Sequence, residues 1–213
     1  MLVGTTVSDN IRADVAFSER IFPPAMINFL KEYSYSIFKM LVNQIGMTMF
    51  GLVLSMATHQ NDTLLLITSL FAVLFYMVLL YTMTWEVGYA EKIRIDNNRL
   101  KLTPLKGLYM SLVANIPNIV LAILAIVGYY GGVLENGVPV SPEWAVNLYG
   151  TAKIIALFIQ GMYSGIVSLY FPATPWVLLL IVLPSLVTCT LAYLAGVKGK
   201  RFTRLLGPSE SRE

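Results

Sequence analysis

The chain has 213 residues, of which 56% are hydrophobic and 13% are charged, and its formal net charge is +3. Soluble domains carry about 25% charged residues, so this composition, with a mean hydropathy of +0.68, excludes an ordinary soluble protein. It predicts an all-α membrane protein, a bundle of four to five transmembrane helices in one domain. The small basic excess favours anionic lipid headgroups over nucleic acid as the charged partner.

Residues 1–24 are polar and of mixed charge, and Pro23-Pro24 ends any structure that precedes them. A helix is expected over residues 25–56. Its first half is amphipathic and is expected to lie in the membrane interface, while its second half spans. A short polar turn then leads to a second, nearly uniformly apolar span over residues 64–86.

The one strongly basic stretch in the middle of the chain, residues 91–106, alternates polar and apolar side chains around Asn97-Asn98. A period of two is typical of a strand, and asparagines tolerate the positive φ of a tight turn. The pattern predicts a short cytoplasmic β-hairpin near residues 91–104. The alternative is that the preceding helix runs on through Ile95 and that Asn97-Asn98 form a loop.

Three further apolar segments are expected over residues 107–130, 147–171 and 176–196. The single transmembrane domain therefore runs from residue 25 to residue 205. A polar C-terminal tail, residues 206–213, follows it.

The basic residues constrain which segments cross. Fourteen of the 15 Lys and Arg lie in three regions, residues 12–39, 92–106 and 198–212, and positive charges next to spans stay in the cytoplasm. The N-terminus, the 91–106 loop and the C-terminus share the cytoplasmic side only if one late segment enters the membrane and returns. Segment 147–171 is the more polar candidate, so we expect four true spans. The alternative is that this segment, which is long enough, also crosses.

Two basic patches are candidate contacts for anionic lipid or for a membrane or cytosolic protein partner. They comprise Lys92, Arg94, Arg99, Lys101 and Lys106 in the middle of the chain, and Lys198, Lys200, Arg201 and Arg204 near its end.

Four polar residues form a candidate intramembrane site. Asn115 and Asn118 are three apart and share a helix face, and Lys153 and Gln160 lie about two turns apart on one side of the next segment. Polar groups at this depth often mark a substrate or ion path. The alternatives are an interhelical hydrogen bond with a kink at Pro117, and a lysine that reaches to lipid phosphate.

Sequence motifs for catalysis are absent. The chain has one histidine, His59, and one cysteine, Cys189, with no zinc-binding spacing, phosphate-binding glycine loop or Ser/His/Asp set. His59 is interpreted as part of a polar turn and Cys189 as a small buried hydrophobe. We therefore expect no catalytic residue, cofactor or metal site.

Several short runs resemble a group of small bacterial multi-pass integral membrane proteins to which no activity is assigned. They are residues 61–66, 80–86, 92–96, 104–109 and 115–118. The resemblance covers most of residues 25–205 and implies a bacterial inner membrane. It implies no site residues.

Two functions follow from these patterns. The first is a non-enzymatic membrane component that docks a protein partner or anionic lipid through its basic hairpin. The alternative is a small transporter or permease subunit with a polar path at Asn115 and Asn118.

Overall fold

The computed structural model describes residues 24–131, 133–135, 138–140, 142–171 and 174–200. The chain divides into two compact units, residues 1–35 and residues 36–213. The predictions for residues 1–23 and for the tail at 206–213 lie outside the described residues.

The described part of the first unit is the beginning of helix α2 (Pro24–Thr58). Phe29 and Tyr33, four residues apart on this helix, bring their ring centroids to 4.9 Å. This i, i+4 aromatic contact supports the first turns of the helix.

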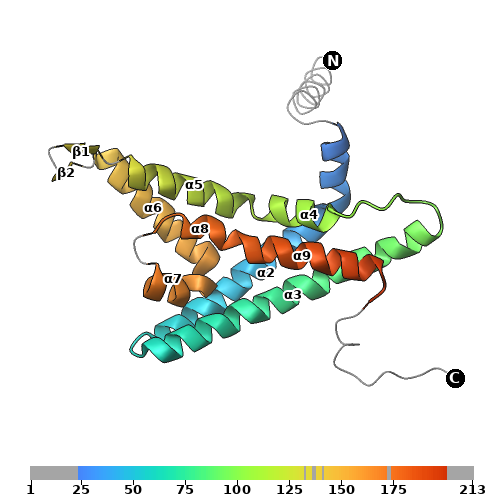
Figure 1. Ribbon diagram of the computed structural model, residues 1–213, viewed down its shortest axis with the longest axis horizontal. Helices are drawn as coiled ribbons and strands as arrows, with labels where there is room; N and C mark the ends of the chain where they lie inside the picture. Colours follow the sequence, from blue (N-terminus) through green and yellow to red (C-terminus); the bar gives the residue numbers. More distant parts are fainter. Residues whose placement is uncertain (1–23, 132, 136–137, 141, 172–173, 201–213) are drawn as a thin grey trace, which may run out of the picture. The chain divides into compact units, whose positions relative to one another are not determined.

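The second unit is helical apart from one short hairpin (Figure 1). Its helices after α2 are α3 (Asp62–Asp96), α4 (Lys106–Ala114), α5 (Ile116–Tyr130), α6 (Glu143–Gln160), the 3₁₀ turn η1 (Gly161–Tyr163), α7 (Ser164–Tyr170), α8 (Val177–Leu180) and α9 (Val182–Val197). Strands β1 (Val133–Glu135) and β2 (Val138–Val140) pair antiparallel between α5 and α6.

Helix α3 begins and ends on asparagines. The side-chain oxygen of Asn61 accepts hydrogen bonds from the backbone N–H groups of Thr63 and Leu64, both at 3.1 Å, and so caps the first turn. At the other end Asn98 has a φ of 56°, and the N–H of Arg99 bonds back to the carbonyl of Arg94 at 2.9 Å. This is the left-handed residue and six-to-one bond of a helix C-cap.

The β-hairpin predicted near residues 91–104 is therefore wrong, and the alternative, a helix that runs on through Ile95, is right. The asparagine pair does supply a positive φ, but to end a helix instead of turning a hairpin. Of the apolar residues in the alternating pattern, Ile93 and Leu102 are more than half exposed, and Ile95 and Leu100 are half-buried. A lone two-stranded hairpin is only marginally stable. Helix α3 is stabilised by contacts that the local alternating pattern does not predict.

The third apolar segment is broken in the middle. Helices α4 and α5 meet at Asn115 and are bent by 56°. Pro117 lies in the first turn of α5, where its ring and missing N–H prevent a continuous helix. The break places the Asn115 side chain in the interior, where it is 4% exposed.

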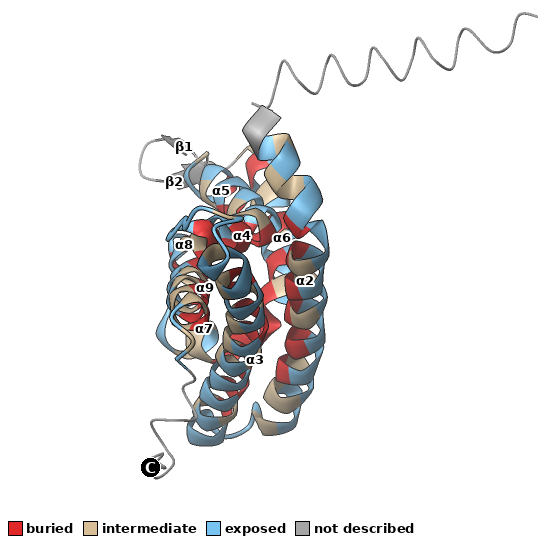
Figure 2. Ribbon diagram, turned by 90° about the vertical axis from the view of Figure 1, so that its right-hand side faces the viewer, coloured by how far each residue is buried: buried red, intermediate tan, exposed pale blue. Residues whose placement is uncertain are grey.

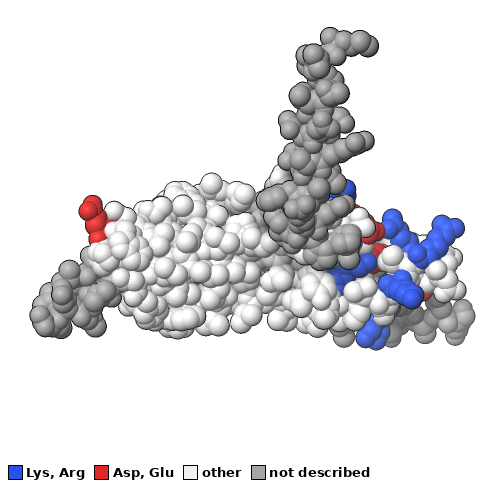
Figure 3. All heavy atoms as spheres, turned by 90° about the horizontal axis from the view of Figure 1, so that it is seen from above, with Lys and Arg blue, Asp and Glu red and all other residues white. Residues whose placement is uncertain are grey.

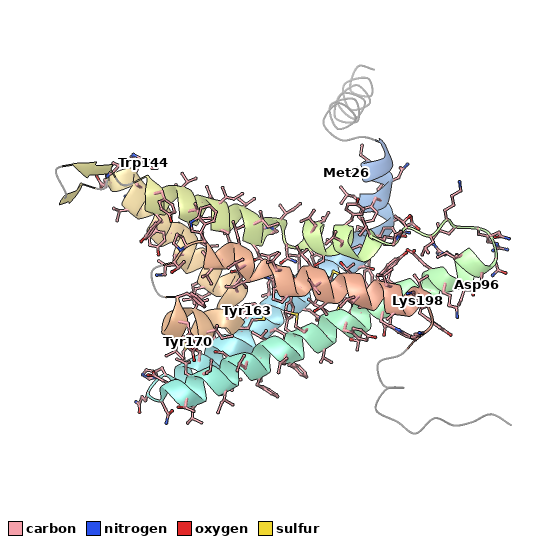
Figure 4. All side chains as sticks on the ribbon, in the orientation of Figure 1. Met26, Asp96, Trp144, Tyr163, Tyr170 and Lys198 are labelled. Atoms are coloured by element: carbon pink, nitrogen blue, oxygen red, sulfur yellow. The ribbon has the colours of Figure 1, made fainter. Side chains whose placement is uncertain are left out.

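The fourth segment, Glu143–Tyr170, is one of the helices long and apolar enough to cross a membrane, and a 3₁₀ turn at Gly161–Tyr163 interrupts it. Helix α6 starts beside the end of α5, because the Trp144 indole lies against Gly131. After η1 and α7, the Trp176 indole N–H donates to the Tyr130 hydroxyl at 3.0 Å, at the same end of α5. Figure 4 shows Trp144 and Tyr170 toward one end, with Tyr163 farther inside.

Helices α3 and α9 run parallel and approach closely through glycines. A Cβ on Gly88 would collide with the carbonyl of Tyr193, and one on Gly196 with the carbonyl of Trp85. Small residues at such contacts allow membrane helices to pack backbone to backbone. Buried residues lie on the inner helix faces and exposed residues on the outer ones (Figure 2).

The outward faces are themselves apolar. Exposed side chains along α3 include Phe71, Leu74 and Val78, an arrangement that suits lipid and not water. Four helices are long and apolar enough to cross a membrane, and the bent α4–α5 pair raises the number to five if it counts as one span. Length and composition thus agree with a multi-pass membrane protein.

Candidate intramembrane site

Asn115 and Asn118 form a hydrogen-bonded chain at the break between α4 and α5. The Asn118 amide donates to the side-chain oxygen of Asn115 at 2.8 Å. The Asn115 amide donates in turn to the Ser185 hydroxyl on α9, at 3.1 Å, and to the carbonyl of Ser111, at 2.9 Å. The predicted pair therefore contact one another and also join α5 to α9.

Two side chains of α2 form hydrogen bonds with the fourth segment where α6 ends. Gln44 and Thr48, one helical turn apart, both donate to the carbonyl of Ile159, at 3.1 and 2.8 Å. These bonds satisfy a carbonyl in the last turn of α6, which no helical N–H can reach once the helix ends. Gly161 then allows close approach, since a Cβ there would meet the Leu52 side chain.

A cavity of about 10 Å³ lies between these elements, close to the volume that one water molecule needs. We call the polar groups around it the polar centre. They are Gln44, Tyr76, Asn115, Asn118, Gln160, Tyr163 and Ser185.

Three oxygens of the polar centre have no hydrogen-bond partner among the residues that the structure describes: Asn118 Oδ1, Gln160 Oε1 and the Tyr163 hydroxyl. Their residues are 2%, 5% and 7% exposed. Leaving such groups unpaired in an apolar interior costs about 1–3 kcal/mol each. One buried water in the cavity can supply hydrogen bonds to these oxygens.

A larger pocket of about 550 Å³ adjoins the polar centre. It lies among α2, α6, α7 and the start of the last segment, and Gln160, Tyr163 and Ile181 line both it and the small cavity. Lys153 lies on its wall, with Nζ 5.4 Å from the centroid of the Tyr149 ring.

The four predicted intramembrane residues thus separate into two groups. Asn115, Asn118 and Gln160 meet at the polar centre, whereas Lys153 lines only the larger pocket. The sequence did not predict four members of the polar centre, which are Gln44, Tyr76, Tyr163 and Ser185. Gln44 and Thr48 carried a detectable signal, polar side chains four apart in an apolar run, but nothing distinguished Tyr76 from other tyrosines of the spans.

The basic residues gather at the end where α3 and α9 finish (Figure 3). Arg94, Arg99, Lys101, Lys198 and Lys200 are exposed there, and Lys92 is half-buried. Arg201 and Arg204 lie outside the described residues.

Among the basic residues that the structure describes, Lys106 is the one that is buried. Its Nζ donates to Glu91 Oε2 at 2.8 Å, and the Tyr193 hydroxyl donates to the same oxygen at 2.6 Å. Lys106 is 7% exposed and Glu91 3%. The candidate contact at Lys106 is therefore an internal ion pair that ties α3, α4 and α9 together.

Comparisons with protein-family models, with curated proteins and with solved structures found no match. Among the described residues, no group of three His, Cys, Asp or Glu side chains is placed to hold a metal ion. The polar centre and the pocket beside it are the features of this chain that bear on function.

Proposed function

We propose that this protein is a small integral membrane carrier that binds a solute in the larger pocket and passes it across the membrane through the polar centre, whose cavity must widen during passage. One observation supports this above all. Two interrupted helices, α4–α5 at Asn115 and α6–α7 at residues 161–163, meet at one buried cavity lined by oxygens that have no hydrogen-bond partner among the described residues. Secondary transporters commonly build their midplane sites from such discontinuous helices.

The proposed topology has four crossings, made by α2, α3, α4–α5 and α8–α9. Segment 143–170 enters from the outer side and returns, which is supported by the contacts of Trp144 with Gly131 and of Trp176 with Tyr130. The basic end then faces the cytoplasm of a bacterial inner membrane, in agreement with the positive-inside rule. The first turns of α2 form an amphipathic extension in the interface.

In this orientation the pocket lies toward the outer side and leads to the polar centre through the shared residues Gln160, Tyr163 and Ile181. From the centre toward the cytoplasm, α3 and α9 pack closely at Gly88 and Gly196. In the proposed cycle this arrangement is the outward-facing state, and transport requires these helices to separate on the cytoplasmic side.

Labelling with a thiol reagent tests the carrier without knowledge of its solute. In a Cys189→Ser background, Ser185→Cys places a nearly isosteric thiol at the polar centre. We expect a membrane-impermeant cationic methanethiosulfonate to modify it from the outer side in right-side-out vesicles and from the cytoplasmic side in inverted ones. Leu191→Cys, on a lipid-facing position that is 59% exposed, is the control and should stay unmodified. Modification of Ser185→Cys from neither side refutes the carrier.

A second function is supported by a separate observation. Helix α3 has 35 residues, about 52 Å at 1.5 Å per residue, and so exceeds a hydrocarbon core of about 30 Å. The excess places Arg94 beyond the core, together with Arg99 and Lys101 on the following loop. We propose that this basic end also contacts anionic lipid headgroups of the cytoplasmic leaflet.

A further inference from the structure

The pocket beside the polar centre has the features of a ligand site. Its volume of about 550 Å³ falls within the range of about 300–1,000 Å³ that small-molecule sites occupy. Most of its lining is apolar, from Leu52 and Met56 on α2 to Leu178 and Ile181 in the last segment. An apolar body fits such walls.

The lining also carries polar groups that favour an anion. Among the described residues on the wall, Lys153 is the one charged side chain, and no Asp or Glu is among them. Lys153 follows Glu143, the first residue of α6, by ten positions, or about 15 Å along the helix axis. Lys153 is exposed on its helix, and a cation at that depth is costly in lipid unless it meets an anion or reaches lipid phosphate.

Two hydroxyl groups complete this pattern at the inner end. Tyr163 and Ser164 line the pocket. Their hydroxyl oxygens are buried and have no hydrogen-bond partner among the described residues, so each side chain must rotate to present its hydroxyl to a ligand. Tyr163 is 7% exposed. Each hydroxyl can donate to an oxygen anion, so the lysine and the hydroxyls all suit the same sign of ligand charge.

We propose that this pocket binds a single-chain amphiphile with one anionic head group, the head against Lys153 and the chain against the apolar walls. Transfer of the head from Lys153 past Tyr163 and Ser164 toward the polar centre would require the cavity there, which has room for one water, to widen. The binding step stands on the pocket alone, but the claim that this amphiphile is the transported solute depends on the proposed carrier.

Octanesulfonate is a suitable probe because its head group stays ionised and does not cross lipid unaided as a neutral acid. The purified full chain in nanodiscs of zwitterionic lipid is photolabelled with a diazirine-bearing octanesulfonate, and labelled peptides are located by mass spectrometry. We expect labelling within residues 149–181, and competition by octanesulfonate at least about tenfold stronger than by octanol or octyltrimethylammonium, as a charge-assisted hydrogen bond implies.

Variants at Lys153 then test whether its charge binds the head group. Lys153→Gln should weaken competition by octanesulfonate at least about tenfold, Lys153→Arg should retain it, and Lys200→Gln, which removes an exposed lysine far from the pocket, should leave it unchanged. Leu157→Trp, which fills the pocket without touching charge, should abolish labelling and serves if Lys153→Gln fails to fold.

Three results would overturn the proposal: equal competition by octanol, competition by dioctanoyl phosphatidylglycerol as strong as by octanesulfonate, or labelling that falls only outside residues 149–181. The first result would contradict recognition of the negative charge. The second would contradict the preference for a single chain, and the third would contradict the location of the site. If the pocket is labelled but Ser185→Cys is never modified, this inference holds and the carrier is refuted. If Ser185→Cys is modified but the pocket is not labelled, the carrier holds and this inference alone is refuted.

Discussion

Lys106 Nζ and Glu91 Oε2 form a buried ion pair at 2.8 Å, and the Tyr193 hydroxyl donates to the same carboxylate oxygen. The pair links residues 15 positions apart across the loop that joins α3 to α4. Because both side chains are less than a tenth exposed, neither charge is well solvated by water. Their mutual contact, with the added bond from Tyr193, compensates for the lost hydration.

Removing one partner of this pair should destabilise the protein strongly. Lys106→Met leaves the Glu91 carboxylate buried without its cation, and we expect a loss of about 3–5 kcal/mol in the free energy of unfolding. The double variant Lys106→Met with Glu91→Gln should recover part of that loss. Thermal denaturation in detergent measures both, with Lys101→Met at an exposed position as the matched control. A single variant as stable as this control would contradict the prediction.

The close contact of α3 with α9 gives a second prediction. In Gly88→Ala the new methyl group collides with the carbonyl of Tyr193, which belongs to a helix backbone and cannot rotate away. We expect a loss of about 1–3 kcal/mol in unfolding free energy. Gly150→Ala is the control, since a Cβ there meets nothing within 4 Å, and it should be neutral or slightly stabilising. Equal stability of the two variants would show that the helices can shift apart freely.

The same residues show how far the sequence predicts this fold. Composition and apolar runs correctly predict a helical membrane protein, because lipid forces each span to satisfy its own backbone groups. The hairpin prediction failed at residues 91–104 because alternation over so few residues also fits a helix end. The deciding contact, Glu91 with Lys106 and Tyr193, joins residues up to 102 positions apart and leaves no local pattern.

The polar centre was only half predictable for a related reason. Asn115 and Asn118 stand out in an apolar run because amides are rare there and sit three residues apart. That Gln160 would join them, and Lys153 would not, depends on where the fourth segment turns. The turn at Gly161 is stabilised by tertiary hydrogen bonds from Gln44 and Thr48 on α2. The spacing of residues along the sequence does not predict these bonds.

The proposed return of the fourth segment can be checked by labelling from each side. In the Cys189→Ser background, Glu143→Cys and Thr174→Cys should both react with an impermeant maleimide from the outer side, because nearby Trp144 and Trp176 contact Gly131 and Tyr130 at the end of α5. Arg99→Cys should react from the cytoplasmic side and serves as the orientation control. Reaction of Thr174→Cys from the cytoplasm would show that the segment crosses.

Charge reversal tests the basic end. Arg94, Arg99 and Lys101 are exposed, and each contributes about 1 kcal/mol of attraction to an anionic surface. Changing all three to Glu should reduce the phosphatidylglycerol that co-purifies with the protein and release any acidic protein partner. Lipid mass spectrometry of the purified protein measures the first effect, and pull-down from native membranes the second. Unchanged lipid and partner content would leave these charges without a docking role.

Substitution at the polar centre should stop transport without preventing ligand binding in the pocket. Asn115→Leu with Asn118→Leu removes the amide chain that reaches Ser185. Each hydrogen bond that the two side chains no longer offer to the solute during passage costs about 1 kcal/mol. We therefore expect the uptake of radiolabelled octanesulfonate into proteoliposomes to fall at least about tenfold. Photolabelling of the pocket should persist, because Lys153 is unaffected. Asn43→Leu, an amide on α2 outside both cavities, is the matched control and should transport normally. Uptake by the double variant at the rate of this control would mean that the two asparagines only join helices.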